Sequence, residues 1–228
     1  MKTGKFYGVG LGPGDPELVT LKALKVLRQV AVIRFVEPPR GGRSISGRIL
    51  AALPDICPDR RPLTFSMSCD RIERQQRIRA YADAIAADLR QGLDCAFTAI
   101  GDPMTYSTCG YLLRELKQRD ANLEFEIVPG VNAWSALAAA AGEVLAEDEE
   151  ILRIVPSYRE TADQADAGER TVRLKTYRTR DRLVRQLADA GRQPLYGCDI
   201  GLANQFISRD PAAITARSPD YLSMLLHR

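Results

Sequence analysis

The chain has 228 residues, of which 45% are hydrophobic and 27% are charged, and its formal net charge is +3 at pH 7. These values are typical of a globular protein with one large or two smaller domains, and so mild a charge does not indicate nucleic acid as a partner. No run of about 18 apolar residues predicts a membrane span, and the first residues lead directly into a strand, so we expect a cytoplasmic protein without a signal peptide.

The first half of the chain alternates short apolar segments with amphipathic ones. We expect strands at residues 6–9, 30–36, 62–65 and 95–99, and helices at residues 45–53, 70–91 and 106–119. Another helix follows Asp15 or Thr20, which are both candidate N-caps, and Gly92 is placed to end a helix. Because the links are short, we interpret residues 1–120 as an N-terminal α/β domain with parallel strands.

A polar stretch at residues 118–122 is the candidate domain boundary. Beyond it we expect strands at residues 124–128, 151–155, 171–176, 195–200 and 221–226, and helices at residues 132–141 and 179–190. The helix of residues 132–141 is rich in alanine, whose small side chain permits close approach to a neighbour. Residues 157–170 are polar and form either a short exposed helix or a loop. We therefore interpret residues 121–228 as a second, C-terminal α/β domain.

Glycines at positions 8, 10, 12 and 14 follow the first expected strand. Such a loop can turn with positive φ and brings main chain, rather than side chains, close to a ligand. It is not a dinucleotide fingerprint, because Pro13 and Asp15 stand where G-x-G-x-x-G requires glycine. Taken alone, the loop could also be a tight strand-to-helix turn without a ligand.

Two further strand ends share this design, with an apolar strand, a Gly/Pro turn and then a helix start. They are residues 100–106 (IGDPMTY) and residues 128–133 (VPGVNA). In open α/β sheets, ligands bind outside the carboxyl ends of the strands, which is where all three loops fall. Three such loops in order indicate a ligand site more strongly than one does.

The histidine and cysteine content limits the available chemistry. His227 is the only histidine and stands next to the last residue of the sequence, which argues against a histidine base, a serine–histidine pair and a histidine-rich metal site. The five cysteines include no C-x-x-C pair, which favours small core residues over a disulfide framework or a zinc site. The chemistry must come from the positioning of reactants or from a cofactor.

Three motifs together resemble the tetrapyrrole methylase family, the class III S-adenosylmethionine-dependent methyltransferases. They are GVGLGPGDPELVTLKA at residues 8–23, GDPMTYST at residues 101–108 and VPGV at residues 128–131. The resemblance extends over essentially the whole chain. GDPMTYST, LKTYR at residues 174–178 and the basic loop at residues 40–48 look most like the branch of the family that methylates precorrin-2 at C-20.

The resemblance implies two α/β domains, S-adenosylmethionine in a cleft between them, and a homodimer. The cofactor contacts that it implies are Pro13, Ile100, Gly101, Asp102, Thr105, Asn132, Ala133 and Leu174, with Gly201 as a weaker candidate. The candidate substrate contacts are Arg40, Arg43, Arg48, Tyr106 and Lys175, because the implied substrate is a polycarboxylate and arginine pairs with carboxylates in two-point geometry. Neither a metal site nor a catalytic side chain is assigned.

Structural roles compete with several of these assignments. Asp102 could cap the following helix, Tyr106 could pack in the core, and the arginine loop and Lys175 could simply be solvated. The sequence also departs from the family pattern, since GEVL at residues 142–145 stands in place of Gly-x-Pro-Leu and residues 156–171 are fewer than in close relatives. These departures leave the choice of tetrapyrrole in doubt.

The expected function is therefore S-adenosylmethionine-dependent methylation of precorrin-2, or of cobalt-factor II, at C-20 in cobalamin biosynthesis. The alternatives are methylation at another ring position and a non-catalytic module that binds the cofactor or a tetrapyrrole. A nicotinamide-dependent oxidoreductase is disfavoured by the glycine spacing. The sequence distinguishes neither the metal-free from the cobalt-containing substrate nor the residue that accepts the proton.

Overall fold

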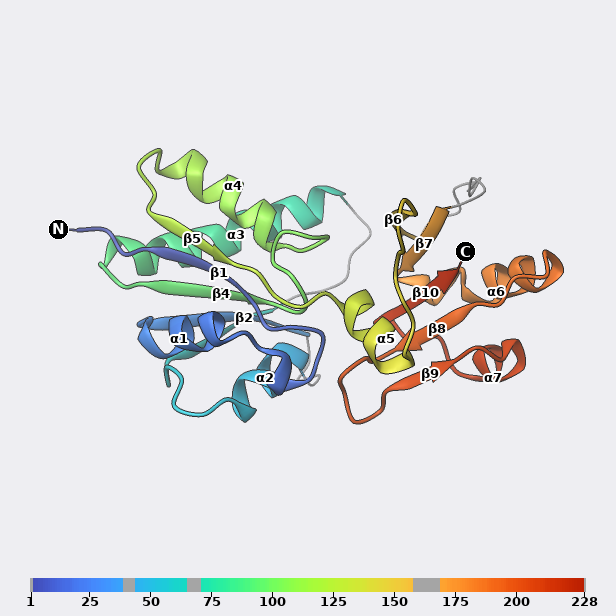
Figure 1. The fold of residues 1–228 in the computed structure, drawn as a ribbon. Helices are drawn as coiled ribbons and strands as arrows, with labels where there is room; N and C mark the ends of the chain where they lie inside the picture. Colours follow the sequence, from blue (N-terminus) through green and yellow to red (C-terminus); the bar gives the residue numbers. More distant parts are fainter. Residues whose placement is uncertain (1, 39–43, 65–70, 158–168, 228) are drawn as a thin grey trace. The chain divides into compact units, whose positions relative to one another are not determined.

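The chain forms two compact units in the computed structural model, Met1–Asn132 and Ala133–Arg228, as Figure 1 shows. The structure describes residues 2–38, 44–64, 71–157 and 169–227. Each unit contains one five-stranded sheet with helices packed on it, which confirms the expected α/β class. None of the helices in these described segments is long and apolar enough to cross a membrane.

The first unit has a fully parallel sheet with the strand order β3-β2-β4-β1-β5. Its strands are β1 (Phe6–Gly10), β2 (Val32–Glu37), β3 (Arg60–Thr64), β4 (Cys95–Ala99) and β5 (Phe125–Val128), and its helices are α1 (Leu21–Gln29), α2 (Ile45–Ala52), α3 (Arg71–Arg90) and α4 (Cys109–Arg119). Parallel strands all end at one edge of their sheet. The loops that follow β4, β1 and β5 are therefore neighbours at that edge.

Helices cover both faces of this sheet, with α3 and α4 on one face and α1 and α2 on the other (Figure 1). The five residues of β4 are all buried. Phe97 packs with α3 and α4, whereas its neighbour Ala96 packs with α1 and α2. This alternation is the expected period of a strand, and burial on both faces explains why a central parallel strand is a continuous apolar run in the sequence.

Both candidate N-caps after β1 are confirmed. The carboxylate of Asp15 accepts a hydrogen bond from the N–H of Glu17 at 2.9 Å and begins a single 3₁₀ turn, Pro16–Leu18. The hydroxyl of Thr20 accepts one from the N–H of Ala23 at 3.1 Å and caps α1. The chain therefore leaves the glycine loop through two successive capped turns, which fix its direction.

The division between the units lies later in the sequence than the expected boundary at residues 120/121. Strand β5 pairs with β1, with Phe6 opposite Phe125 and Val9 opposite Val128, so it belongs to the first sheet. The polar stretch before it is a tight turn, in which the side chain of Asp120 accepts a hydrogen bond from the N–H of Asn122 at 2.9 Å. Polarity at this point marks a turn within one unit rather than a linker.

The second unit has a mixed sheet with the order β6-β7-β10-β8-β9. Its elements are α5 (Ala133–Ala141), β6 (Ile151–Pro156), β7 (Glu169–Leu174), α6 (Arg180–Asp189), β8 (Leu195–Cys198), β9 (Phe206–Ser208), α7 (Pro211–Ala216) and β10 (Ser223–His227), with a 3₁₀ turn at Thr176–Arg178. The β6–β7 pair is parallel and the other pairs are antiparallel. The sequence had not predicted β9 and α7.

Helices also cover the two faces of the second sheet. On one face, Leu183 of α6 and Ile214 of α7 pack with Tyr196 of β8. On the other face, a Cβ atom at Gly197 would lie only 2.6 Å from Cδ1 of Leu137, so α5 packs directly against the main chain of β8. The close approach expected for the alanine-rich helix is thus present, but at this point Gly197 of the strand and Leu137 of the helix make it rather than an alanine.

Candidate functional site

The glycine loops that follow β1 and β4 are joined by main-chain hydrogen bonds beyond the ends of their strands. The N–H of Leu11 donates to the carbonyl oxygen of Ala99 at 2.8 Å, and the N–H of Gly101 donates to that of Gly12 at 2.6 Å. Gly12 and Gly101 form an isolated antiparallel bridge, with φ values of +73° and +70°. These positive φ values explain why glycine is needed at both positions.

The loop after β5 packs against the other two through main-chain atoms. A Cβ atom at Gly10 would lie 2.6 Å from Cα of Gly130 and 2.7 Å from the carbonyl oxygen of Gly101, so no side chain fits there. The α-carbon of Gly101 is uncrowded by contrast, because a Cβ placed on it would meet only the carbonyl oxygen of Val131, at 4.0 Å. The three loops thus form one main-chain surface at the carboxyl edge of the sheet.

Asp102 ties two of these loops together. Its Oδ1 accepts hydrogen bonds from the N–H of Met104 at 2.8 Å and from the hydroxyl of Thr105 at 3.2 Å. Its Oδ2 accepts one from the N–H of Gly130 at 3.3 Å. Helix α4 begins only at Cys109, so the alternative that Asp102 caps this helix is wrong. The carboxylate instead holds the geometry of the loops.

Tyr106 lies on this loop, and its side chain is 49% exposed, so the alternative of core packing is wrong. Its φ of +50° is incompatible with a right-handed helix, which is why α4 starts later than expected. A non-glycine residue in this conformation costs about 1–3 kcal/mol, and such strain is concentrated at functional sites. Met104, beside it, is 54% exposed, so two large side chains rise from the same loop.

The described cysteines are buried and free, as expected of core residues. Cys109 lies behind the glycine loop, where its sulfur would be 2.6 Å from a Cβ at Gly8. Burial, followed by the charge of Asp102, raises the pKa of this thiol to about 12. Burial likewise raises the pKa of the Cys95 thiol to about 12. Both thiols are protonated near neutral pH and are unsuited to nucleophilic catalysis.

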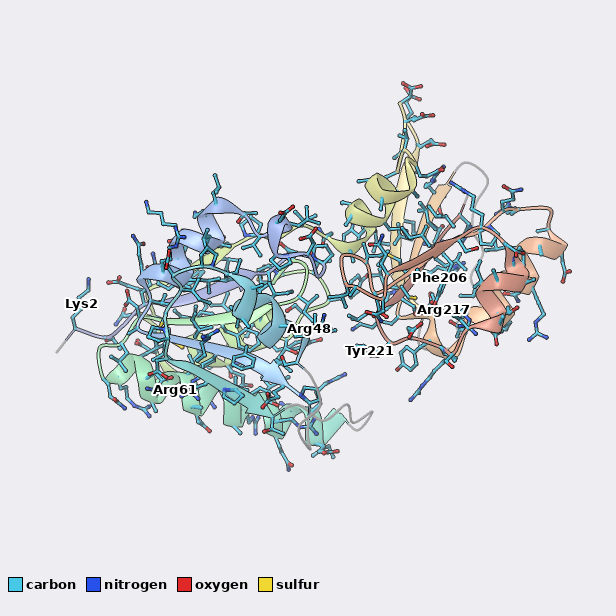
Figure 2. All side chains as sticks on the ribbon, turned by 90° about the horizontal axis from the view of Figure 1, so that it is seen from below. Lys2, Arg48, Arg61, Phe206, Arg217 and Tyr221 are labelled. Atoms are coloured by element: carbon cyan, nitrogen blue, oxygen red, sulfur yellow. The ribbon has the colours of Figure 1, made fainter. Side chains whose placement is uncertain are left out.

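Of the three candidate arginines, Arg40 and Arg43 lie outside the described residues. Arg48 is exposed and lies in α2 rather than in a loop, as Figure 2 shows. Helix α2 is capped by Ser44, whose hydroxyl accepts a hydrogen bond from the N–H of Gly47 at 3.0 Å and donates one to the carbonyl of Val36 at 2.6 Å. Arg48 therefore has a fixed backbone position just beyond the carboxyl end of β2.

The candidate residues of the second unit gather at one edge of its sheet. Leu174 ends β7 opposite Met224, and Cys198 ends β8 opposite Ser223, so both strands end beside the start of β10. Lys175, the residue after β7, has a φ of +57°, and this conformation ends the strand at Leu174. Gly201 follows β8 with a φ of +79°. Leu174, Lys175 and Gly201 are thus close in the fold although distant in the sequence.

Lys175 lies near one ring of an aromatic pair. Its ammonium nitrogen lies 6.0 Å from the centroid of the Tyr221 ring, and this ring lies 5.4 Å from that of Tyr177. Figure 2 labels Tyr221 on this surface. The motif LKTYR thus supplies Lys175 and Tyr177, and the distant Tyr221 adds a second ring; of these three residues the sequence predicted only Lys175.

A cluster of two acids beside Gly201 was not predicted from the sequence. Ligand atoms of Cys198, Asp199 and Asp220 lie within 4.8 Å of one another. Asp199 has a φ of +51°, and burial, followed by the charge of Asp220, raises its pKa. Arg217 pairs with Asp220 at 3.4 Å and offsets part of this negative charge. Because Asp220 comes from a distant segment, no local motif could reveal the cluster.

The fold and the loops define the class to which the chain belongs. It is a member of the Tetrapyrrole (Corrin/Porphyrin) Methylases, whose family model matches residues 5–214. This match confirms the family that the three motifs predicted.

Individual members of this family are similar to the chain over most of its length. The chain is 34% identical over 180 residues to the "Probable cobalt-precorrin-2 C(20)-methyltransferase" of Methanocaldococcus jannaschii, covering 78% of this chain and 75% of the relative. It is 33% identical over 204 residues to the precorrin-2 C(20)-methyltransferase of a Sinorhizobium species, covering 83% and 80%. Among solved structures, the uroporphyrin-III C-methyltransferase from Thermus thermophilus complexed with S-adenyl homocysteine has the same fold, with a TM-score of 0.66, 20% identity and coverage of 98% of this chain and 92% of that one.

Proposed function

We propose that this protein is an S-adenosylmethionine-dependent methyltransferase of cobalamin biosynthesis, which methylates precorrin-2 or cobalt-factor II at C-20. The observation that carries the proposal is the joining of the three family loops into one main-chain surface, in a chain whose relatives named for this reaction are 34% and 33% identical to it. The proposed enzyme is cytoplasmic and homodimeric, and light scattering after size-exclusion chromatography measures its assembly state.

The residues of the first unit fit the cofactor. The uncrowded α-carbon of Gly101 and the glycine main chain around it suit a ligand that is held by carbonyl and N–H groups rather than by charged side chains. When bound, S-adenosylmethionine supplies a methyl group that its sulfonium activates. Main-chain carbonyl oxygens can hold such a polarised methyl through C–H···O contacts worth about 0.5–1 kcal/mol each. The proposed contacts in the first unit are Pro13, Ile100, Gly101, Asp102, Thr105 and Asn132. Those in the second unit are Ala133, Leu174 and Gly201.

Asp102 has a distinct part in this set. All three of its described hydrogen bonds go to groups of the protein itself, namely Met104, Thr105 and Gly130. We therefore assign to its carboxylate the positioning of the cofactor loops.

The proposed substrate contacts are cationic and aromatic, as a polycarboxylate macrocycle requires. Arg48 on α2 and Lys175 after β7 offer positive charge to its carboxylates. Tyr106 and the Tyr177–Tyr221 pair offer apolar faces. Arg40 and Arg43 complete the proposed set from outside the described residues. These residues orient the substrate and exclude water, which is the main contribution that the protein makes to the reaction.

The test is an anaerobic incubation of the purified protein with S-adenosylmethionine and either precorrin-2 or cobalt-factor II in separate tubes, followed by mass spectrometry. One added methyl group in either tube supports the proposal and identifies the substrate, and NMR then assigns the carbon. If neither tetrapyrrole gains a methyl group while cofactor binding is intact, the substrate assignment is wrong, and either another tetrapyrrole or a binding module takes its place.

A further inference from the structure

A hollow of about 180 Å³ lies in the second unit, at the edge of the sheet opposite to Leu174 and Gly201. Leu195, the first residue of β8, lines it together with Leu226 of β10, and these two residues are paired across the sheet. Gly201 follows the other end of β8. Since a strand rises about 3.3 Å per residue, roughly 10 Å of β8 separates the hollow from the residues assigned to the cofactor.

Two arginines and one glutamate dominate the wall of this hollow. Arg170, whose side chain is 4% exposed, pairs with Glu143, and the same carboxylate also accepts a hydrogen bond from Arg209. One negative charge therefore faces two positive charges. Both arginines lower the pKa of Glu143, Arg170 through the stronger hydrogen bond, so the carboxylate is ionised near neutral pH.

Arg170 retains an unused donor. Among the described residues, its Nε is buried and has no hydrogen-bond partner. A buried charged donor without a partner is costly, because it has lost its water and gained nothing in return. His227, also in the wall, accepts a hydrogen bond at Nε2 from Nε of Arg173 at 3.0 Å, so this nitrogen already has a partner within the fold.

We propose that this hollow binds a small oxyanion, a phosphate or a carboxylate, through Arg209 and Arg170. The excess positive charge selects an anion, and guanidinium groups match the oxygens of phosphate and carboxylate. Pockets for drug-sized ligands measure about 300–1,000 Å³, so a hollow of this size suits only a small ion. Glu143 precedes Val144, the residue at which the GEVL segment departs from the Gly-x-Pro-Leu pattern, and neither residue belongs to the three glycine loops.

A purely structural role is the competing interpretation. Buried Arg–Glu–Arg triads exist that hold a fold together without any ligand. A triad with a purely structural role binds no further anion saturably, whereas an anion site binds phosphate saturably. The two interpretations therefore differ in one measurable property of the unmodified protein.

The experiment is isothermal titration calorimetry of the full chain with inorganic phosphate and, separately, with malonate, at an ionic strength kept constant with chloride. Arg209→Gln removes one guanidinium whose side chain is 43% exposed, so the variant should fold. Arg185→Gln is the matched control, because Arg185 is exposed on α6 and donates to the carbonyl of Asp181 at 3.1 Å, outside the hollow. Melting curves in chloride verify the folding of both variants.

We expect saturable binding to the unmodified protein and to Arg185→Gln, and affinity weaker by about tenfold in Arg209→Gln. The tighter of the two anions identifies the class of ligand. The absence of saturable binding to the unmodified protein, or equal binding to Arg209→Gln, overturns the proposal. No tetrapyrrole or methyl donor enters the assay, so its outcome is independent of the proposed methyltransferase activity.

Discussion

The carboxylate of Asp102 accepts a hydrogen bond from the main-chain N–H of Gly130 at 3.3 Å. This bond links the loop after β4 to the loop after β5, and the other oxygen of the same carboxylate organises the β4 loop itself. The acid of the GDP motif therefore acts on main-chain geometry at the carboxyl edge of the first sheet.

Asp102→Ala should weaken the binding of S-adenosylmethionine by at least about tenfold, because it leaves the N–H groups of Met104 and Gly130 without an acceptor. The affinity of Asp102→Asn for the cofactor should lie between those of the unmodified protein and Asp102→Ala, since one amide oxygen replaces two carboxylate oxygens as acceptor. Calorimetric titration with the cofactor measures the effect. Asp120→Ala is the control, because Asp120 makes a similar turn contact with the N–H of Asn122 at 2.9 Å, in the turn before β5 and away from the carboxyl ends of the strands. Unchanged cofactor affinity in Asp102→Ala would contradict the positioning role.

Gly10→Ala and Gly130→Ala should each destabilise the protein by about 1–3 kcal/mol, since a methyl group at either position overlaps the main chain of a neighbouring loop. Gly110→Ala should instead be neutral or stabilising by up to about 1 kcal/mol. Gly110 lies in α4, and the nearest atom to its added Cβ is Cε of Met104 at 4.0 Å. Urea denaturation compares the three variants. Similar free energies of unfolding in all three would show that the loops do not pack as described.

Glu126 on β5 pairs with the ammonium groups of Lys22 at 2.7 Å and Lys5 at 2.8 Å. These hydrogen bonds, that of Lys22 first, lower the pKa of Glu126 from 4.5 to about 2. A carboxyl whose pKa is lower in the folded chain stabilises it fully above the unfolded value and progressively less as the pH falls through the folded value. The stabilisation from Glu126 should therefore be lost between about pH 4.5 and pH 2.

Glu126→Gln should lower the free energy of unfolding at pH 7 by up to about 1 kcal/mol, as is usual for partly exposed pairs. The difference from the unmodified protein should shrink as the pH falls toward 2, and it should shrink with added salt at pH 7. Denaturation curves across this pH range measure both trends. Glu149→Gln, at an exposed position of the second unit, serves as the control. A difference that stays constant with pH would argue against the ion-pair explanation.

The thiols of Cys57, Cys95, Cys109 and Cys198 should resist alkylation in the folded protein at pH 8. Each is buried, and the pKa of Cys95 and of Cys109 is raised to about 12 by burial. Iodoacetamide labelling followed by peptide mass spectrometry identifies which thiols react before and after unfolding in urea. Rapid labelling of any of these four in the folded state would contradict their place in the core.

The sequence predicted most elements of the first unit because their signals are local. Strand β4 was placed at its observed bounds, since a central strand buried on both faces is a short apolar run between turn residues. The boundary near residue 120 was placed too early for a non-local reason. Nothing within residues 124–128 indicates that they pair with β1, because the choice of a strand partner depends on residues far away in the sequence.

In the second unit, the missed elements are too short for a periodic signal, with three residues in β9 and six in α7. A local signal for α7 does exist. Asp210 precedes Pro211 and accepts hydrogen bonds from the N–H groups of Ala212 at 3.0 Å and Ala213 at 3.3 Å, which is the pattern of a capped helix start.

Part of the candidate site could be predicted from its motifs, whereas its strain could not. Tyr106 and Lys175 both adopt positive φ, a conformation that usually indicates glycine or asparagine in a sequence. Tyrosine and lysine give no such indication, so the expected helix and strand were drawn through them. The contact between Asp102 and Gly130 could not be predicted either, because it joins two loops that are distant in the sequence, and neither motif shows that they are close in the fold.

The pairing of β1 with β5 has a consequence for how the protein is made. Strand β1 lies between β4 and β5, so it gains its second neighbour only after residue 128 has been synthesised. Until then one side of β1 is an open edge, which can pair with the strands of other chains. A shortened chain that ends at residue 120 keeps this edge open permanently, whereas one that ends at residue 132 carries the complete sheet.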